Sequence, residues 1–231
     1  MRRISSFLLL ITLLATGTAF TTGCSGPETT VRSRADQNPP TSTLNLQELI
    51  NTTPDGGTVT IPMGRYVLSD GLRVHDRNNL TISCAPGSQI LVDDISADVI
   101  EIANSQNIRI EGAFLRHLKP LPEYECHGDV LKMRSSENIV VEDSELDGCG
   151  AIGVAVWQCR NVQVKQCLIQ NNSFNALYFE SAENVHIANC IIQDNANLFQ
   201  MYRSQDIQMS GNIIRRNGGY WEEPETPGLR K

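Results

Sequence analysis

The sequence predicts an all-β fold: a parallel β-helix of about six to seven coils, with a short capping helix at its N-terminal end. The main observation is a 13-residue pattern that recurs six times between residues 70 and 209. Within each copy, apolar residues alternate with polar ones. An Asn or Asp also stands at the same position of every copy, which indicates one turn repeated along the chain.

Each repeat contains three short strands. The copies begin 28, 31, 23, 23 and 22 residues apart, at Asp70, Asp98, Asp129, Ile152, Asn175 and Asn197. The third and fifth residues of each copy are apolar, as in Leu131 and Met133, which indicates a strand with one buried face. The alternation resumes after the Asn, and a small residue and an aliphatic residue then mark a third strand. This pattern is typical of a β-helix coil rather than a helical or leucine-rich repeat.

The repeated turn position suits Asn for two physical reasons. Asn tolerates a left-handed backbone, and its amide can bond to the same residue in the coils above and below. The residues at this position are Asn79, Asn107, Asn138, Asn161, Asn184 and Asp206.

With these repeats, the sequence resembles the pectin-lyase-like superfamily of right-handed parallel β-helices. The resemblance extends over residues 44–217, which we interpret as one domain. Leu44–Ile50 is expected to form a short helix, followed by Gly56–Pro62 and Gly64–Tyr66, as at the start of such domains. A helix is needed there because the first coil would otherwise expose apolar side chains and strand edges. Residues 218–231 form a tail that offers no comparable cap.

The N-terminus has the features of a secretory signal over residues 1–23, with two arginines, an apolar run and small residues. Cys24 directly follows Gly23 and resembles the acylated Cys of the bacterial lipobox, although Thr21 stands where that motif usually has an aliphatic residue. We therefore expect lipid attachment at Cys24, with ordinary secretion as the alternative. Residues 24–43 are expected to tether the domain to a membrane of the bacterial cell envelope.

Composition and charge disfavour several classes of function for this protein. With 231 residues, 40% of them hydrophobic, the chain has the composition of one globular domain. Its formal net charge of -7 repels phosphates, which disfavours nucleic-acid binding. Among the 7 cysteines there is no CxxC pair of the zinc-finger type.

Two pairs of cysteines occupy equivalent positions in adjacent repeats. Cys126 and Cys149 both lie twelve residues before their Asn, in a turn, and we predict a disulfide between them. Cys167 and Cys190 both lie six residues after theirs. We interpret this second pair as part of a column of small core residues with Ser144 and Ala113.

The outward positions of the first strand form two columns that together suit a sugar chain. Aromatic rings beside charged groups provide a stacking surface and hydrogen-bond partners. The first column contains Arg73, Glu101, Lys132, Ala155, Tyr178 and Gln200, and the second contains His75, Ala103, Arg134, Trp157, Glu180 and Tyr202. The alternative is that the aromatic residues only cover one another across strands.

The 31-residue spacing reflects an insertion around residues 116–128, which contributes His117 and His127 to the candidate substrate-binding residues. Polysaccharide lyases of this fold use Lys or Arg as the base that removes the proton alpha to the uronate carboxylate. Calcium or a second cation neutralises the enolate that forms. That resemblance implies Lys132 or Arg134 as the base. It also implies Asp129 and Glu101 as ligands if Ca²⁺ is bound. The alternative is that Lys132 and Arg134 form a solvated face.

The first residues of the copies form another candidate column. The segment His127–Met133 is similar to the Asn-Thr-Asp-Gly segment of polygalacturonases, which implies that Asp129 acts as a general acid. Asp70, Asp98 and Asp129 could also supply the carboxylate pair of a glycosidase. However, Ala151 and Ile152 stand where polygalacturonases have paired Asp, and a turn-capping role explains the column equally well.

Two hypotheses about function remain open at this point. In the first, the protein binds a polysaccharide on the outward strand face and, if it is an enzyme, cleaves it as a lyase or, less favoured, as a hydrolase. In the second, it is a non-catalytic structural or adhesion scaffold whose C-terminal end contacts another protein end to end. Fold alone does not decide between them.

Overall fold

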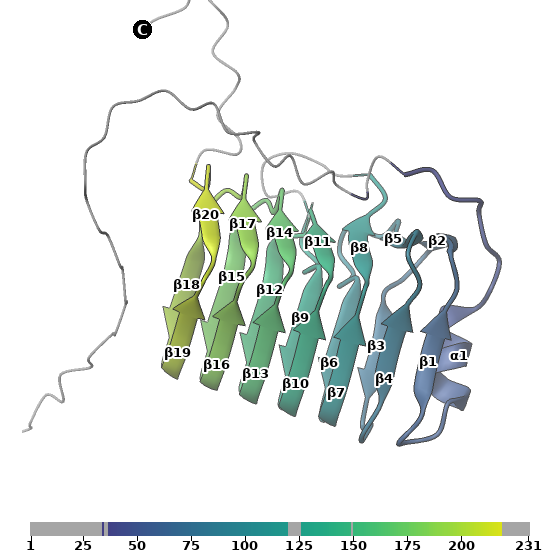
Figure 1. The fold of residues 1–231 in the computed structure, drawn as a ribbon, viewed down its shortest axis with the longest axis horizontal. Coiled ribbons are helices and arrows are strands. Elements are labelled where there is room, and N and C mark those ends of the chain that lie inside the picture. Colours follow the sequence, from purple (N-terminus) through teal and green to yellow (C-terminus); the bar gives the residue numbers. More distant parts are fainter. Residues whose placement is uncertain (1–33, 35–36, 120–125, 149, 219–231) are drawn as a thin grey trace, which may run out of the picture.

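The computed structural model describes residues 34, 37–119, 126–148 and 150–218. The described chain is all-β apart from the helix α1 (Leu46–Thr52) and one short turn of 3₁₀ type at Arg34. Its strands stack in parallel into three sheets, as Figure 1 shows. Among the described residues, no helix has both the length and the apolar character that crossing a membrane requires.

Each complete coil contributes one strand to each of the three sheets, and the first coil contributes only β1 and β2, to sheets 2 and 3. Sheet 1 consists of β3 (Leu72–His75), β6 (Ile100–Ala103), β9 (Leu131–Arg134), β12 (Ile152–Trp157), β15 (Asn175–Glu180) and β18 (Phe199–Tyr202). Sheet 2 consists of β1 (Thr58–Ile61), β4 (Thr81–Cys84), β7 (Gln106–Glu111), β10 (Glu137–Glu142), β13 (Arg160–Lys165), β16 (Glu183–Ala188) and β19 (Gln205–Ser210). Sheet 3 consists of β2 (Gly64–Leu68), β5 (Ser88–Val92), β8 (Phe114–His117), β11 (Glu145–Asp147), β14 (Leu168–Gln170), β17 (Ile191–Gln193) and β20 (Ile213–Arg215).

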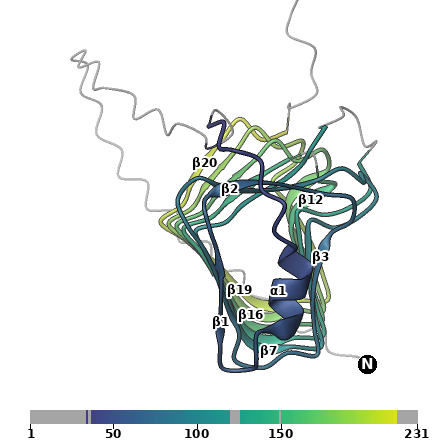
Figure 2. The same ribbon diagram turned by 90° about the vertical axis from the view of Figure 1, so that its right-hand side faces the viewer.

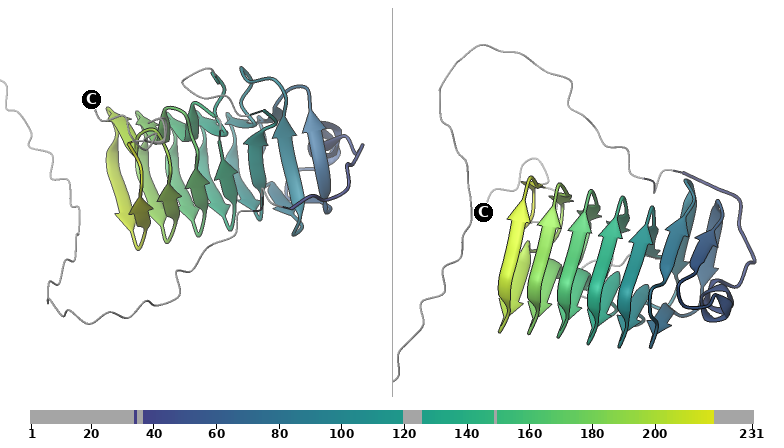
Figure 3. Two further views of the ribbon diagram at one scale, coloured as in Figure 1. Left: turned by 90° about the horizontal axis from the view of Figure 1, so that it is seen from above. Right: turned by 60° about the horizontal axis from the view of Figure 1, so that its bottom comes forward.

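The chain winds from sheet 1 to sheet 2 to sheet 3 and then begins the next coil (Figures 2 and 3). The three sheets enclose one apolar core, into which every second residue of a strand points. In sheet 1 the inward column is fully buried over Ile100, Leu131, Val154 and Leu177. The predicted fold, with six to seven coils, is therefore confirmed.

The residues at which the chain turns from sheet 1 into sheet 2 form the expected ladder, with Asn79 just before β4 and each later member as the second residue of its strand in sheet 2. Asn79, Asn107, Asn138, Asn161, Asn184 and Asp206 all have positive φ angles, between 52° and 57°. Each Asn from Asn107 to Asn184 donates its amide N–H to the Oδ1 of the Asn one coil earlier, at 2.8–2.9 Å. Both predicted properties of Asn, the left-handed backbone and the bond between coils, are confirmed.

Helix α1 covers the N-terminal end of the core. It begins two residues later than Leu44 because Asn45 caps it, accepting a hydrogen bond from the backbone N–H of Glu48 at 3.1 Å. Leu46 and Ile50 point from the helix into the core and are almost completely buried. The helix thus shields the first coil, as predicted.

Part of the predicted tether packs against the domain. Ser42 donates its N–H to the carbonyl of Arg65, and the N–H of Arg65 donates to the carbonyl of Pro40, at 2.9 and 2.8 Å. Residues 40–42 therefore pair with the edge of β2 in parallel, and we call the segment 37–42 the strap. The predicted signal, Cys24 and the remainder of the tether lie outside the described residues.

The cysteines divide into a bonded and a free group. Cys126 is disulfide-bonded. Cys149 lies outside the described residues, so its pairing with Cys126 stays a prediction. Cys167 and Cys190 are free and buried, and the N–H of Cys167 lies 3.4 Å from the Sγ of Cys190. They form the predicted core column.

The last coil differs from those before it. Phe199 is 42% exposed and Ile213 is 55% exposed, whereas Leu177, which pairs with Phe199 one coil earlier, is fully buried. Among the described residues, no element comparable to α1 covers this end of the solenoid.

Candidate functional site

The outward face of sheet 1 has the predicted arrangement of side chains. The pairing register aligns Arg73 with Glu101, Glu101 with Lys132, and so on to Gln200. The second column, from His75 to Tyr202, is in register over the same strands. Successive members of each column therefore lie side by side on neighbouring strands, and the face becomes one continuous surface.

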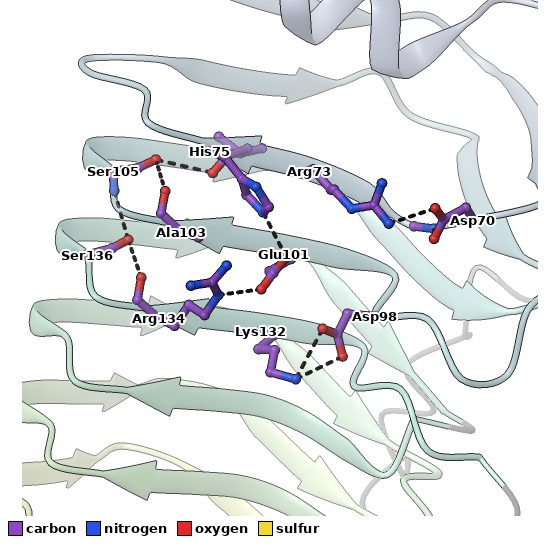
Figure 4. Close-up of polar contacts among 12 residues, drawn as sticks. Asp70, Arg73, His75, Asp98, Glu101, Ala103, Ser105, Lys132, Arg134 and Ser136 are labelled. Atoms are coloured by element: carbon purple, nitrogen blue, oxygen red, sulfur yellow. Dashed lines mark hydrogen bonds and ion pairs between the residues drawn. The ribbon is translucent and has the colours of Figure 1, made fainter.

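An acidic pair around one lysine lies where β9 begins. The Nζ of Lys132 lies 3.2 Å from Oδ2 of Asp98 and 3.6 Å from Oδ2 of Asp129. The backbone N–H of Asp129 also donates to Oδ1 of Asp98 at 2.8 Å. Figure 4 shows Lys132 reaching across to Asp98 from the adjacent strand. Two carboxyl groups thus share one cation.

Asp129 is the electrostatically unusual member of this group. It is only 5% exposed. Its burial, together with the negative charge of Asp98, raises the pKa of Asp129 from 3.8 to about 7, although Lys132 opposes this shift. A carboxyl group with such a pKa is partly protonated near neutral pH, so it can donate a proton.

Lys132 and Arg134 do not have the environment that a proton-abstracting base needs. Burial alone would lower the pKa of Lys132, but the charges of Asp129 and Asp98 outweigh it and raise that pKa. The Nε of Arg134 donates to Oε1 of Glu101 at 2.6 Å, which raises the pKa of Arg134. Both cations are held protonated, which argues against the roles that the lyase resemblance implies.

Glu101 lies between two cationic or polar partners. Besides Arg134, it contacts the Nε2 of His75 at 2.7 Å (Figure 4). Burial would raise the pKa of Glu101, but the hydrogen bonds from Arg134 and His75 lower it overall. Arg73 pairs separately with Asp70 at 2.7 Å.

These contacts do not fit the calcium that the lyase resemblance implies. Glu101 is neutralised by Arg134 and Asp129 lies against Lys132, so neither presents a free carboxylate to a cation. In the described part of the chain, no group of three or more His, Cys, Asp or Glu side chains could hold a metal ion.

The other half of the face is aromatic. The rings of Trp157 and Tyr178 have centroids 4.8 Å apart at an interplanar angle of 33°. The hydroxyl of Tyr178 donates to Oε2 of Glu180 at 2.6 Å, which raises the pKa of Tyr178 to about 12. On the last strand, Tyr202 is 51% exposed and carries the guanidinium of Arg203 4.8 Å above its ring. These side chains form a partly exposed surface of the kind that sugar rings stack on.

The two histidines from the insertion behave differently. His117 was predicted to bind substrate from a loop, but it ends β8, is fully buried and contacts the carbonyl of Ala97 through Nε2 at 2.9 Å. Burial lowers the pKa of His117. The prediction for His117 is therefore wrong, because its side chain lies on the buried, inward face of β8. His127 is exposed, and its proposed contact with substrate stays a prediction.

From the sequence, Asp98 is one of three candidate carboxyl groups in the first column, with turn capping as the alternative, and nothing there connects it to Lys132. A signal for this contact existed. Asp98 occupies the same repeat position as Asp129, one coil earlier, and Lys132 follows Asp129 by three residues. A long side chain at that place reaches both carboxyl groups.

Comparison with known proteins identifies the family. Residues 98–221 match the family model described as the right-handed β-helix region. The chain belongs to the right-handed β-helix family. No curated protein matches the sequence.

Solved structures agree with the right-handed β-helix fold. A structure described as a putative glycosyl hydrolase from Parabacteroides merdae superposes with a TM-score of 0.59 at 15% identity, over 69% of this chain and 81% of the other. A pectin methylesterase mutant in complex with a hexasaccharide superposes with a TM-score of 0.53 at 14% identity, over 74% of this chain and 61% of the other. At these identities the likeness shows the fold alone.

Proposed function

We propose that this β-helix protein binds a polysaccharide along the outward face of sheet 1 and hydrolyses it, with Asp129 as the general acid. The observation that carries the proposal is the buried Asp129 carboxyl beside Asp98 and Lys132, with a pKa of about 7. The partly exposed rings of Trp157 and Tyr178 on the same face support a sugar chain as the ligand. The two structural neighbours, described as a putative glycosyl hydrolase and a pectin methylesterase with a bound hexasaccharide, are consistent with this ligand class.

In the proposed reaction, Asp129 donates its proton to the glycosidic oxygen as the bond to the leaving sugar breaks. Asp98 is the second carboxyl group, held within reach of Asp129 by their common contact with Lys132. It would receive a proton from the attacking water or attack the sugar carbon itself. This assignment replaces β-elimination, for which the ion-paired Lys132 and Arg134 are unsuited.

The experiment is to incubate the purified chain with uronate-containing and neutral polysaccharides and to follow the products by mass spectrometry. Hydrolysis adds one water to each cut, whereas elimination leaves an unsaturated uronate end. We expect water-added products that Asp129→Asn removes. The matched control is Asp70→Asn. It changes the same repeat position in an earlier coil, where the side chain is half-exposed, and should keep activity. Unsaturated products would overturn the hydrolytic proposal.

A second candidate function is supported by the last coil. Its exposed Phe199, Met201 and Ile213 would suit a non-catalytic scaffold that contacts another protein end to end. A folded chain that yields no product from any polymer, but binds another envelope protein through this end, would favour this alternative.

We also propose that the protein is exported to the bacterial cell envelope and anchored through Cys24. The support comes from the signal-like segment and the Gly23–Cys24 pair in the sequence. Metabolic labelling with a fatty-acid analogue tests it. Label that is lost in Cys24→Ser supports the anchor, and an unlabelled chain in the culture medium contradicts it.

A further inference from the structure

The strap of residues 37–42 lies over a different face of the solenoid, the outward side of sheet 3. Thr41 bridges to Arg65 in parallel, and the side chain of Gln89 on β5 donates to the carbonyl of Gln37 at 2.8 Å. Gln89 also donates to the carbonyl of Arg34 at 2.9 Å. Figure 2 shows this segment crossing the first coils near β2. The strap is therefore fixed to the sheet at several points.

A cavity of about 310 Å³ lies between the strap and three successive strands. Its lining comes from the strap, from β2, β5 and β8, and from the residue after β8. The lining residues are Gln37, Asn38, Arg65, Gln89, Leu91, Phe114, Arg116 and Leu118. Its volume is at the lower end of the range for small-molecule sites and far exceeds that of a single inorganic ion.

The charged residues that line the cavity are both basic. Two of its lining residues are arginines and none is acidic. Arg65 forms no ion pair and no side-chain hydrogen bond with the described residues, and Arg116 reaches one carboxylate, Asp147, only at 3.8 Å. A guanidinium without a close partner, facing a cavity, is suited to bind a carboxylate in a bidentate manner.

The remaining lining residues favour an organic ligand over a bare anion. The amide side chains of Gln37 and Asn38 provide donors and acceptors for hydroxyl groups, whereas Gln89, whose two N–H donors bond to Gln37 and Arg34, provides an acceptor oxygen. Leu91, Phe114 and Leu118 give an apolar wall for carbon atoms. Gln89 and Phe114 are almost completely buried, at 4% and 1% exposure, so this part of the cavity is held in place.

We propose that this cavity is a second binding site, which takes a small hydroxylated carboxylate of about monosaccharide size, a sugar acid. The carboxylate would contact Arg65 and Arg116, and the hydroxyl groups would contact the amide side chains. The site is separate from the face of sheet 1, and it does not depend on the proposed hydrolysis.

The test is binding of D-glucuronate to the full chain, measured by calorimetry and by NMR shifts of backbone amides. We expect the shifts to concentrate at Arg65, Gln89 and Leu91 in the unmodified chain. Arg65→Gln should weaken glucuronate binding at least tenfold, because it removes the guanidinium but keeps the backbone bonds to the strap. The matched control, Arg160→Gln on sheet 2, replaces an exposed arginine outside both proposed sites and should bind as the unmodified chain does.

Two further probes separate the parts of the proposal. D-glucose has the hydroxyl groups without the carboxylate, and inorganic phosphate has the charge without the ring. Both should bind at least tenfold more weakly than glucuronate. Equal binding of glucose, equal binding of phosphate, shifts confined to sheet 1, or no glucuronate binding would each overturn the proposal. Circular dichroism establishes that Arg65→Gln is folded, and the shift map of the unmodified chain decides the outcome if it is not.

Discussion

The two halves of the sheet 1 face carry different chemistry on the same ladder of strands. On β3, β6 and β9 the outward charges of Arg73, Lys132 and Arg134 all meet carboxylates within 3.2 Å. On β12, β15 and β18 one outward position of each strand carries an aromatic ring instead: Trp157, Tyr178 and Tyr202. The halves meet at Ala155, whose fully buried side chain separates Lys132 from Tyr178. The fold sets the spacing of such a face, and the side chains alone decide what it can bind.

The largest effect on stability should come from replacing Lys132, the cation that contacts both Asp98 and Asp129 in the charged half. In Lys132→Met, Asp98 and Asp129 lose the partner that offsets their charges in a partly buried place. We expect a loss of stability of about 2–3 kcal/mol at pH 8, measured by urea unfolding, because breaking a buried ion pair leaves uncompensated charge. A loss below about 0.5 kcal/mol would mean that the pair is effectively solvated.

The second prediction concerns pH. Because the folded-state pKa of Asp129 is raised from 3.8 to about 7, protonation stabilises the folded state. This contribution is fully present below about pH 3.8 and is lost as the pH rises through about 7. Asp129→Asn should therefore gain stability relative to the unmodified chain as pH rises from 4 to 8, with about 1.4 kcal/mol for each unit of pKa shift as the upper limit.

The measurement is a series of urea unfolding curves across that pH range. Asp70→Asn is the control, because Asp70 is half-exposed and is not part of the acidic pair. A stability difference between Asp129→Asn and the unmodified chain that does not change with pH would contradict the raised pKa.

The third prediction tests the aromatic half. Trp157→Ala and Tyr178→Ala should each weaken polysaccharide binding about tenfold, or about 1.4 kcal/mol, because each removes one ring of the stacked pair. Affinity electrophoresis in gels that contain the polymer measures this. The control is His186→Ala on sheet 2, which alters a half-buried side chain on a different face. Unchanged retardation of both aromatic variants would remove this half from the binding surface.

The smallest effect on stability is expected from replacing Arg73. Arg73→Gln breaks an ion pair with Asp70 in which both side chains are more than half exposed. Solvent and salt screen such a pair, so we expect a change of about 0.5 kcal/mol or less in urea unfolding. A loss as large as that of Lys132→Met would mean that burial does not distinguish the two ion pairs.

The sequence predicted the fold and the two outward columns because the repeat period determines which residues lie side by side. It did not predict which outward charges pair, since that depends on side-chain length and on contacts between coils. The error at His117 has a local cause. Leu115 and His117 are two residues apart on β8 and therefore share the inward face, but the predicted insertion begins at residue 116, inside that strand.

The strap and its cavity could not be predicted for a different reason. Residues 37–42 have neither apolar alternation nor a repeat, so composition alone suggested a tether. Their attachment depends on single backbone hydrogen bonds to Arg65 and on the side chain of Gln89. Such contacts leave no periodic signal in a sequence.

The asparagine ladder also determines where this solenoid can accommodate new sequence. From the first residue of each copy to its Asn or Asp the distance is nine residues in all six copies, so all variation in coil length falls after the ladder. The longest additional segment, around residues 116–128, connects sheet 3 to sheet 1 and ends beside Asp129. Insertions at this corner therefore leave the stacking of the coils intact while they reshape the rim of the sheet 1 face. Changes in ligand specificity could arise there without loss of the fold.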